Sequence, residues 1–397
     1  MSSEASLRSA LFATAICAAG FVFDLSEISF GNALSGVFSA APYAVPTGQL
    51  SWLLSSIYIG AVAGPPLLGT VADRFGRRIA LAVTLLLLAV TSAASAFSPT
   101  IGVLSVFRGF AGIALGAYPP LMITYLTDTL PVRLRGRLIM AMAAMGYLGP
   151  PATLFLMRWL TAAAPLGLEG WRWMLAIDGV GALLAGLLAW RLPESDSWRR
   201  AAESGAGARP ALPRFALVGS LCFLAPWATV AFPMLNAAIL VIKGFNLSDT
   251  LLYVGVSMFG PVIGSIVTAP MADRLERRTS LLICAMAMIA ASIGFYVSNQ
   301  PVWLMVTGFI FNLAVALYMP ALTTHVAELF PARARGRATA WAWSLNRLAA
   351  ALVPLVMLPW LHAQRQGLVF GTVVTTLAVT GLVVALGPRG QAGRVVE

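Results

Sequence analysis

Charged residues are scarce in this chain. Asp, Glu, Lys and Arg make up 10% of its 397 residues, whereas hydrophobic residues make up 59%. A soluble globular protein carries about 25% charged residues on average. So few charges cannot cover the surface of a soluble globule of this size, and we therefore expect lipid to be the solvent for most of the surface. The composition argues against a soluble enzyme.

Cysteine and histidine are also scarce. Cys17, Cys222 and Cys284 lie singly inside apolar runs, and we interpret them as small buried core residues. The two histidines, His325 and His362, have no neighbours with the spacing of metal ligands. We therefore predict no metal site and no cofactor.

Long apolar runs dominate what is present. Twelve of them have about the 20 residues that a membrane-spanning helix needs. They are too long and too continuously apolar for barrel strands, which alternate, so we predict helices. The first run is too long for a signal-peptide core, so we expect it to be retained. The expected helices lie at 11–38, 49–71, 79–97, 101–127, 138–161, 172–191, 214–241, 250–271, 280–298, 302–327, 338–361 and 367–387.

The net charge of +11 is unevenly distributed along the chain. Of the 26 basic residues, 20 fall in segments that the expected helices place on one side of the membrane. This positive-inside bias puts both termini in the cytoplasm, and we see no nucleic-acid site. We therefore predict a multi-pass protein of the inner (cytoplasmic) membrane.

An internal repeat relates two distant segments. Residues 118–137 (YPPLMITYLTDTLPVRLRGR) and 318–337 (YMPALTTHVAELFPARARGR) align without gaps at an offset of 200, with 8 identities in 20 positions. The same offset superposes Ala72-Asp73-Arg74 on Ala272-Asp273-Arg274. Two independent matches at one offset indicate a duplicated unit.

The repeat predicts two parallel six-helix halves with a cavity at the membrane midplane between them. We expect an N-terminal half at 1–192 and a C-terminal half at 214–397. Residues 193–213 are rich in Gly, Ala, Pro and Arg, and are interpreted as a cytoplasmic linker.

Motifs in the loops resemble those of the major facilitator superfamily. Residues 69–78 (GTVADRFGRR) are similar to the signature between helices 2 and 3 of that family. The second copy, at 271–278, is degenerate, with Glu276 where the family has glycine. Leu192-Pro193-Glu194-Ser195 resembles the motif after helix 6 of sugar and metabolite porters. The resemblance covers essentially the whole chain and implies an all-α membrane protein with twelve transmembrane helices in two pseudo-symmetric six-helix bundles.

The resemblance further implies a conformational latch at the cytoplasmic ends of the helices. Charge networks of this kind hold one state and release the other. The alternative is that these charges only set the topology. The expected latch residues are Asp73, Arg74, Arg77, Arg78, Asp128, Arg135, Asp273, Arg274, Glu328 and Arg335.

Five charges fall clearly inside expected helices, away from their ends, where they are costly and are candidates for function. Asp24 and Glu27 are three residues apart and share one face of the first helix. Counted from the outer ends of their helices, Glu27 lies nearer the level of Arg108 than Asp24 does. For Asp178 we favour a structural pairing with Arg158 or Arg172 near the outer surface; the fifth charge is Arg347.

The family resemblance implies roles for the first three of these charges. Asp24 matches an acidic position of proton-coupled porters, and Arg108 matches their helix 4 arginine, so proton coupling by Asp24, Glu27 and Arg108 is expected. The Phe23–Glu27 stretch looks most like the metabolite:proton and synaptic-vesicle-type branch. A permanent ion pair that only holds two helices together is the alternative.

Arg347 is the leading candidate for binding the substrate. A fixed positive charge near the midplane suits a carboxylate, which arginine can hold in a bidentate manner. Alternatively, Arg347 only balances an acid such as Asp178. Further candidates for substrate binding are Asn346, Tyr118, Tyr318, Asn236 and Asn312. The spaced glycines Gly109, Gly112 and Gly116 are interpreted as sites of close helix packing.

The predicted function is symport of a small organic anion with protons by a monomeric secondary transporter. A proton-driven exporter of drugs or metabolites is the alternative, since Gly146–Pro150 resembles the motif of such exporters, although its spacing differs. A sugar porter is disfavoured because the seventh helix lacks the paired glutamines of that family. A non-transporting membrane sensor is disfavoured by the intact loop motifs.

Overall fold

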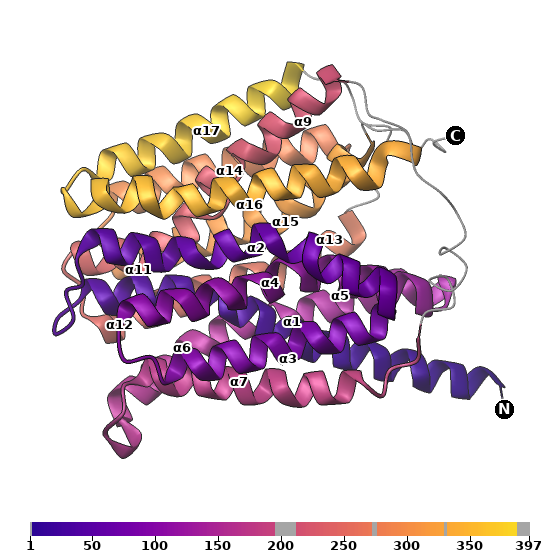
Figure 1. Ribbon diagram of the computed structural model, residues 1–397. Helices are drawn as coiled ribbons and strands as arrows, with labels where there is room; N and C mark the ends of the chain where they lie inside the picture. Colours follow the sequence, from indigo (N-terminus) through magenta and orange to yellow (C-terminus); the bar gives the residue numbers. More distant parts are fainter. Residues whose placement is uncertain (1, 195–211, 272–275, 329–331, 387–397) are drawn as a thin grey trace. The chain divides into compact units, whose positions relative to one another are not determined.

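The computed structural model describes residues 2–194, 212–271, 276–328 and 332–386, and within these ranges it is helical, without strands (Figure 1). The helices are α1 (Ser2–Ser39), α2 (Thr47–Phe75), α3 (Arg77–Ala96), α4 (Ile101–Thr129), α5 (Val132–Gly146), α6 (Gly149–Ala163), the short 3₁₀ helix η1 (Pro165–Gly167), α7 (Gly170–Ala189), α9 (Leu212–Leu224), α10 (Pro226–Thr229), α11 (Ala231–Ile242), α12 (Leu247–Ser257), α13 (Phe259–Met271), α14 (Arg277–Val297), α15 (Pro301–Glu328), α16 (Ala332–His362) and α17 (Gln366–Leu386).

The described residues contain 12 helical stretches that are long and apolar enough to cross a membrane. Their side chains are apolar on nearly every face, as lipid requires, and their backbone polar groups bond within each helix. The predicted all-α membrane fold with twelve spanning helices is therefore confirmed.

The fifth expected helix, 138–161, is not continuous. It consists of α5 and α6, which are separated at Tyr147 and Leu148. Pro150 follows at the second position of α6. Proline has no amide hydrogen to donate and crowds the turn that precedes it, so one helix ends and another begins just before it.

Two helices in the second half of the chain are divided in the same way. The expected helix 214–241 is built from α9, α10 and α11, with Pro226 at the first position of α10. The expected helix 250–271 divides at Met258 into α12 and α13, three residues before Pro261. Each of these three expected spans is confirmed as one stretch able to cross a membrane, and each contains a local break near a proline that hydropathy does not indicate.

Unit 1 comprises residues 1–34 and 56–205. In it, α3 packs against α4 and α7, and α6 packs against α7. Unit 2 comprises residues 35–55 and 206–397, so that it includes the last turn of α1 and the start of α2. Most of the expected linker 193–213 lies outside the described residues.

Unit 2 is built around α15, which packs against α12, α13 and α14, while α9 packs against α16. Phe232 on α11 stacks on Phe311 of α15, with ring centroids 4.1 Å apart, and meets Phe295 of α14 edge-on. The Ser35 hydroxyl donates to the carbonyl of Met234 at 3.0 Å, which joins the end of α1 to α11.

Lys243, just after α11, holds the C-terminal end of α14. Its ammonium group donates to the carbonyl oxygens of Phe295, Tyr296 and Ser298 at 2.9, 3.1 and 2.6 Å. The last carbonyls of a helix have no partners within the helix and carry partial negative charge, so a cation stabilises them. Partial burial lowers the pKa of Lys243.

Candidate functional site

The main cluster of buried charges lies in unit 1, where α1 meets α4. Arg108 forms an ion pair with Glu27 and also donates from Nη2 to the Glu27 backbone carbonyl at 2.9 Å. Its guanidinium carbon lies 5.7 Å from the centre of the Phe30 ring, within cation–π range. Arg108 thus contacts Glu27, in agreement with the level expected for Glu27.

Ser92 of α3 completes the surroundings of Glu27. Its hydroxyl donates to Glu27 Oε1, while Arg108 binds Oε2. Both carboxylate oxygens of Glu27 therefore accept hydrogen bonds. Sequence reasoning missed Ser92, because a serine in an apolar helix carries no distinguishing signal until the fold places it beside a charge.

Asp24 and Asp178 belong to the same electrostatic cluster. Asp24 is fully buried and Asp178 is 2% exposed. The charge of Asp178 interacts with those of Arg108 and Asp24. Asp178 Oδ2 has no hydrogen-bond partner among the described residues. A buried carboxyl with an unsatisfied oxygen is a candidate to carry a proton.

The expected pairing of Asp178 with Arg172 was wrong. Arg172 instead pairs with Glu169 and donates to the carbonyl oxygens of Ala96 and Ser98, at 2.9 Å each. It therefore secures the end of α3. Asp178 lies one residue before Gly179, which packs closely on Ala89 and so lets α7 approach α3.

Small residues bring α2 and α4 into contact near the charge cluster. A Cβ atom added to Gly112 would lie 1.9 Å from the carbonyl oxygen of Ile57, and one added to Gly116 would lie 2.3 Å from that of Ala61. No side chain fits in such a space. The interpretation of these two glycines as sites of close helix packing is confirmed.

The structure places Tyr118 in the core of unit 1. Its hydroxyl donates to the carbonyl of Cys17 at 3.0 Å and lies where a side chain on Gly20 would be. Its repeat-related counterpart Tyr318 is also buried, but its hydroxyl has no hydrogen-bond partner among the described residues. The hydroxyl of Tyr118 is therefore already used within the protein, whereas that of Tyr318 is available to a ligand or to water.

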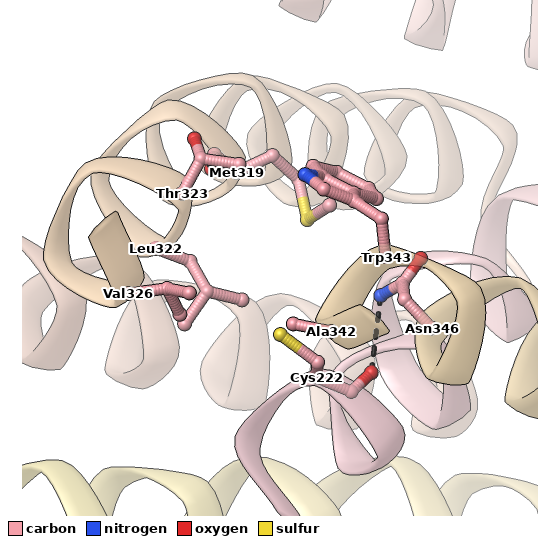
Figure 2. A pocket seen from close by; sticks show the side chains of 8 residues that line it. All are labelled: Cys222, Met319, Leu322, Thr323, Val326, Ala342, Trp343 and Asn346. Carbon is pink, nitrogen blue, oxygen red and sulfur yellow. Dashed lines mark hydrogen bonds between the residues drawn. The ribbon is translucent and has the colours of Figure 1, made fainter. Parts of the chain in front are cut away.

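A small cavity of about 10 Å³ lies in unit 2, between α9, α15 and α16 (Figure 2). Asn346 of α16 lies at its edge and donates to the carbonyl of Cys222 at 3.1 Å (Figure 2). The side chains of Trp343 and Met319 both line the cavity (Figure 2). Arg347 follows Asn346, and its guanidinium carbon lies 5.7 Å from the centre of the Trp343 ring. The lining residues are Cys222, Met319, Leu322, Thr323, Val326, Ala342, Trp343 and Asn346.

A second polar group in unit 2 surrounds Gly308 of α15. Asn236 of α11 is buried, and neither polar atom of its amide has a hydrogen-bond partner among the described residues. Asn312 donates to the carbonyl of Gly308 at 2.9 Å, one turn away on its own helix. A buried amide without partners costs about 1–3 kcal/mol, so Asn236 is suited to meet a polar ligand.

The end of unit 1 where α2 is joined to α3 holds part of the expected latch. Arg77, the first residue of α3, forms an ion pair with Asp128 near the end of α4. Glu194 Oε1 accepts hydrogen bonds from the amides of Arg77 and Arg78, at 2.9 and 3.2 Å. The α3 helix thus begins on a carboxylate that compensates its dipole. Gly76, in the left-handed region with φ 97°, makes the turn between α2 and α3 possible.

The remaining latch residues are only partly described. Arg135 donates to the carbonyl of Leu130 at 3.4 Å. Asp73 acts electrostatically on Arg77. The expected positions Asp273 and Arg274 lie outside the described residues, as do the side chains of Glu328 and Arg335. A latch role for this set stays a prediction.

A larger, open cavity of about 420 Å³ in unit 2 was not foreseen from the sequence. It is lined by the ends of α1, α11 and α16 and by the start of α2. The imidazole of His362 forms hydrogen bonds with the Thr47 hydroxyl at 2.6 Å and, more weakly, with that of Ser39 at 3.5 Å. These bonds hold the segment between α1 and α2 against α16.

Comparison with known proteins agrees with this arrangement. Residues 16–354 match the Major Facilitator Superfamily. The chain is 26% identical to the niacin transporter NiaP of Acinetobacter baylyi, with 89% of this chain and 88% of that one covered. It is also 26% identical to the arabinose-proton symporter of Bacillus subtilis, with 86% and 85% covered.

The fold is similar to a solved structure, the inward-open conformation of the xylose transporter XylE from E. coli. The TM-score is 0.80 at 18% identity, with 98% of both chains covered. At that level of identity the likeness shows the fold alone.

Proposed function

Since this chain belongs to the Major Facilitator Superfamily and its relatives are transporters rather than enzymes, we propose that it moves a small organic anion across the membrane by proton-coupled alternating access. The observation that carries the proposal is the buried cluster of Asp24, Glu27, Asp178 and Arg108 in unit 1. Charges are placed inside a membrane at high cost, and proton relays are among the few uses that justify them.

The proton site centres on Asp24, with Glu27 beside it and Arg108 as the group that senses their charge. An ionised acid attracts the arginine, and a protonated acid releases it, so proton binding changes the forces between α1 and the helices around it. Such a change can bias a rocking motion of the two halves about a midplane site. The Arg77–Asp128 pair is proposed to stabilise one of the resulting states.

The substrate is proposed to be an anion because of α16. Arg347 supplies positive charge beside Asn346, and the neighbouring cavity is lined mostly by apolar side chains. The guanidinium can hold a carboxylate in a bidentate manner, while the cavity itself, at about 10 Å³, has room for about one water molecule. Nicotinate, which is niacin in its ionised form, is a suitable first probe because one relative is a niacin transporter.

A sugar is the second candidate. Two relatives are an arabinose-proton symporter and a D-xylose transporter, and the unpartnered amide of Asn236 suits a hydroxyl group. One argument against a sugar is that its hydroxyl groups need many hydrogen-bonding partners. The residues described around the cavity in Figure 2 offer few of them.

Thermal unfolding of the purified protein with nicotinate, arabinose and xylose separates these candidates. A ligand that binds only the folded state raises the midpoint by mass action. We expect nicotinate to raise the midpoint of the wild type and not that of Arg347→Ala. Stabilisation by the two sugars but not by nicotinate would contradict the anion proposal.

We further propose a monomer in the inner membrane, with both termini in the cytoplasm. The run of arginines in the loops after α2 and α4 supports this orientation. Labelling of single cysteines introduced at residues 4 and 395, in inside-out against right-side-out vesicles, tests it.

A further inference from the structure

The open cavity of about 420 Å³ in unit 2 has the size of a small-molecule site. Its polar lining consists of four neutral side chains from two places in the chain. Ser39 and Thr47 come from the end of α1 and the start of α2, and His362 and Gln364 come from the end of α16 and the residues that follow. The described residues that line the cavity include no Asp or Glu.

The backbone at Gln364 is strained, and a second helix of unit 2 shows that the strain is not needed to end a helix. The helices α11 and α16 end in the same motif, in which a left-handed residue and the residue after it donate their amides to carbonyls of the last turn. In α11 the left-handed residue is Gly244, with φ 95°, whereas in α16 it is Gln364, with φ 59°. Glycine adopts this conformation without steric cost, and glutamine does not. A side chain that lines a cavity from a strained position is a candidate for binding.

The two ring nitrogens of His362 are engaged unequally. The Thr47 hydroxyl lies 2.6 Å from Nδ1, whereas the Ser39 hydroxyl lies 3.5 Å from Nε2, at the limit of a hydrogen bond. When Thr47 donates to Nδ1, the neutral ring carries its hydrogen on Nε2. That hydrogen then has only a distant partner, so it is the donor that the ring offers to an incoming oxygen atom.

The charges next to the lining residues are positive. Lys243 directly follows the lining residue Ile242, and the exposed Arg365 directly follows Gln364. The acid that comes next in the chain after Lys243 is Asp249, and it accepts a hydrogen bond from the Asn246 side chain at 2.7 Å. Positive charge around a cavity that offers neutral donors favours an anionic ligand.

We propose that this cavity binds a small organic carboxylate, separately from the transport site proposed near Arg347. The carboxylate accepts hydrogen bonds from Nε2 of His362 and from the side-chain amide of Gln364, and its apolar body lies against Pro46 and Ile242. His362 lies fifteen residues beyond Arg347 on α16, about 22 Å along the helix, so one small ligand does not reach both. The proposal goes beyond the proposed function and does not depend on it.

Nuclear magnetic resonance of the histidine rings tests the site directly, because the chain has only two histidines. The full-length protein in lipid nanodiscs, with ¹³C-labelled histidine, is titrated with benzoate, and His362→Gln assigns the two ring signals. We expect the His362 signal to shift in a saturable way and the signal of the buried His325 to stay in place. Benzamide, which has the same shape without the charge, should give no shift. An unchanged His362 signal, or an equal shift with benzamide, would overturn the proposal.

Gln364→Gly removes the binding side chain and leaves the helix end intact, because Gly244 already serves in the same motif. We expect its unfolding midpoint to match or exceed that of the wild type, since the strain is relieved. The benzoate concentration at half-saturation should rise about tenfold, as the loss of one hydrogen bond to a charged group implies. Unchanged binding of benzoate by this folded variant would overturn the role of Gln364 and the proposed site.

Arg347→Ala separates this proposal from the proposed function. We expect it to leave the benzoate-dependent shift of His362 unchanged. Loss of that shift would show that carboxylates act on His362 from the site near Arg347, and would overturn a second site. An open site on the surface is also weak, so at ligand concentrations below its Kd it does not alter the unfolding midpoints that test Arg347. Failure of nicotinate to bind near Arg347 would leave the His362 result standing.

Discussion

The two units carry repeat-related helices that differ at one equivalent position, where one has a charged residue and the other a neutral one. At the repeat offset of 200, Arg108 of α4 corresponds to Gly308 of α15. In unit 1 the arginine holds Glu27. In unit 2 the space beside the glycine is taken by neutral groups, since a Cβ on Gly308 would lie 2.5 Å from Ser257 Oγ and 3.7 Å from Asn236 Nδ2.

The serines of α3 and α14 show the same divergence. Ser92 and Ser292 are related by the same offset, and both are completely buried. Ser92 donates to the Glu27 carboxylate, whereas Ser292 donates to the carbonyl of Ile289 on its own helix, at 2.9 Å. A duplicated scaffold can thus keep its packing while one copy carries charge. We propose proton chemistry for unit 1 and substrate binding for unit 2.

The largest effect is expected where unit 1 is made to resemble unit 2. Arg108→Leu leaves Glu27 buried without its counter-ion, and breaking a buried pair in this way costs about 3–5 kcal/mol of the free energy of unfolding. Thermal unfolding in detergent measures it. The double variant Glu27→Gln/Arg108→Leu serves as the control and should recover much of the loss. A single variant as stable as the wild type would contradict the account of this pair.

An intermediate effect is expected from the matched serines. Ser92→Ala removes a hydrogen bond to a charged group, which contributes about 1.5–3 kcal/mol. Ser292→Ala removes a bond to a backbone carbonyl on the same helix, and we expect a change of less than about 0.5 kcal/mol in the free energy of unfolding, as at sites away from any special feature. Unfolding midpoints of the two variants give the comparison. Equal losses would mean that Ser92 has no special relation to Glu27.

The smallest effect on stability is expected in the polar groups of unit 2. Asn236→Leu removes an amide without described partners, so stability should be unchanged or should rise by about 1 kcal/mol, and substrate affinity should fall. Asn346→Leu is the matched control, because it removes the bond to the Cys222 carbonyl and should cost about 1 kcal/mol. Unfolding midpoints and uptake KM values are measured for both. A strong destabilisation by Asn236→Leu would show that its amide is already satisfied within the protein.

Hydropathy was sufficient to predict the twelve spanning helices, since lipid imposes length and apolarity on each of them. Hydropathy did not predict the breaks near Pro150, Pro226 and Pro261, where the missing amide hydrogen of proline interrupts the helix. Prolines elsewhere, such as Pro65 and Pro120, stay within continuous helices. A proline alone therefore does not predict a break, which depends on the neighbouring helices as well.

The charge site was predictable only in part. Depth along each helix was enough to favour Glu27 as the partner of Arg108, because ion pairs need equal levels in the membrane. The same reasoning misplaced Asp178, because it gave no information on which way α7 faces. Ser92 and Glu194 could not be ranked, since their importance comes from groups that are distant in the sequence and adjacent in the fold.

The most direct test of the central claim is nicotinate uptake into proteoliposomes by the wild type and by Asp24→Asn, with and without an imposed pH gradient. Asparagine resembles a carboxyl that cannot release its proton. We predict that the wild type accumulates nicotinate when the outside is acidic. We also predict that Asp24→Asn accumulates far less but still exchanges internal for external nicotinate. Full gradient-driven accumulation by Asp24→Asn would contradict the assignment of the proton site to unit 1.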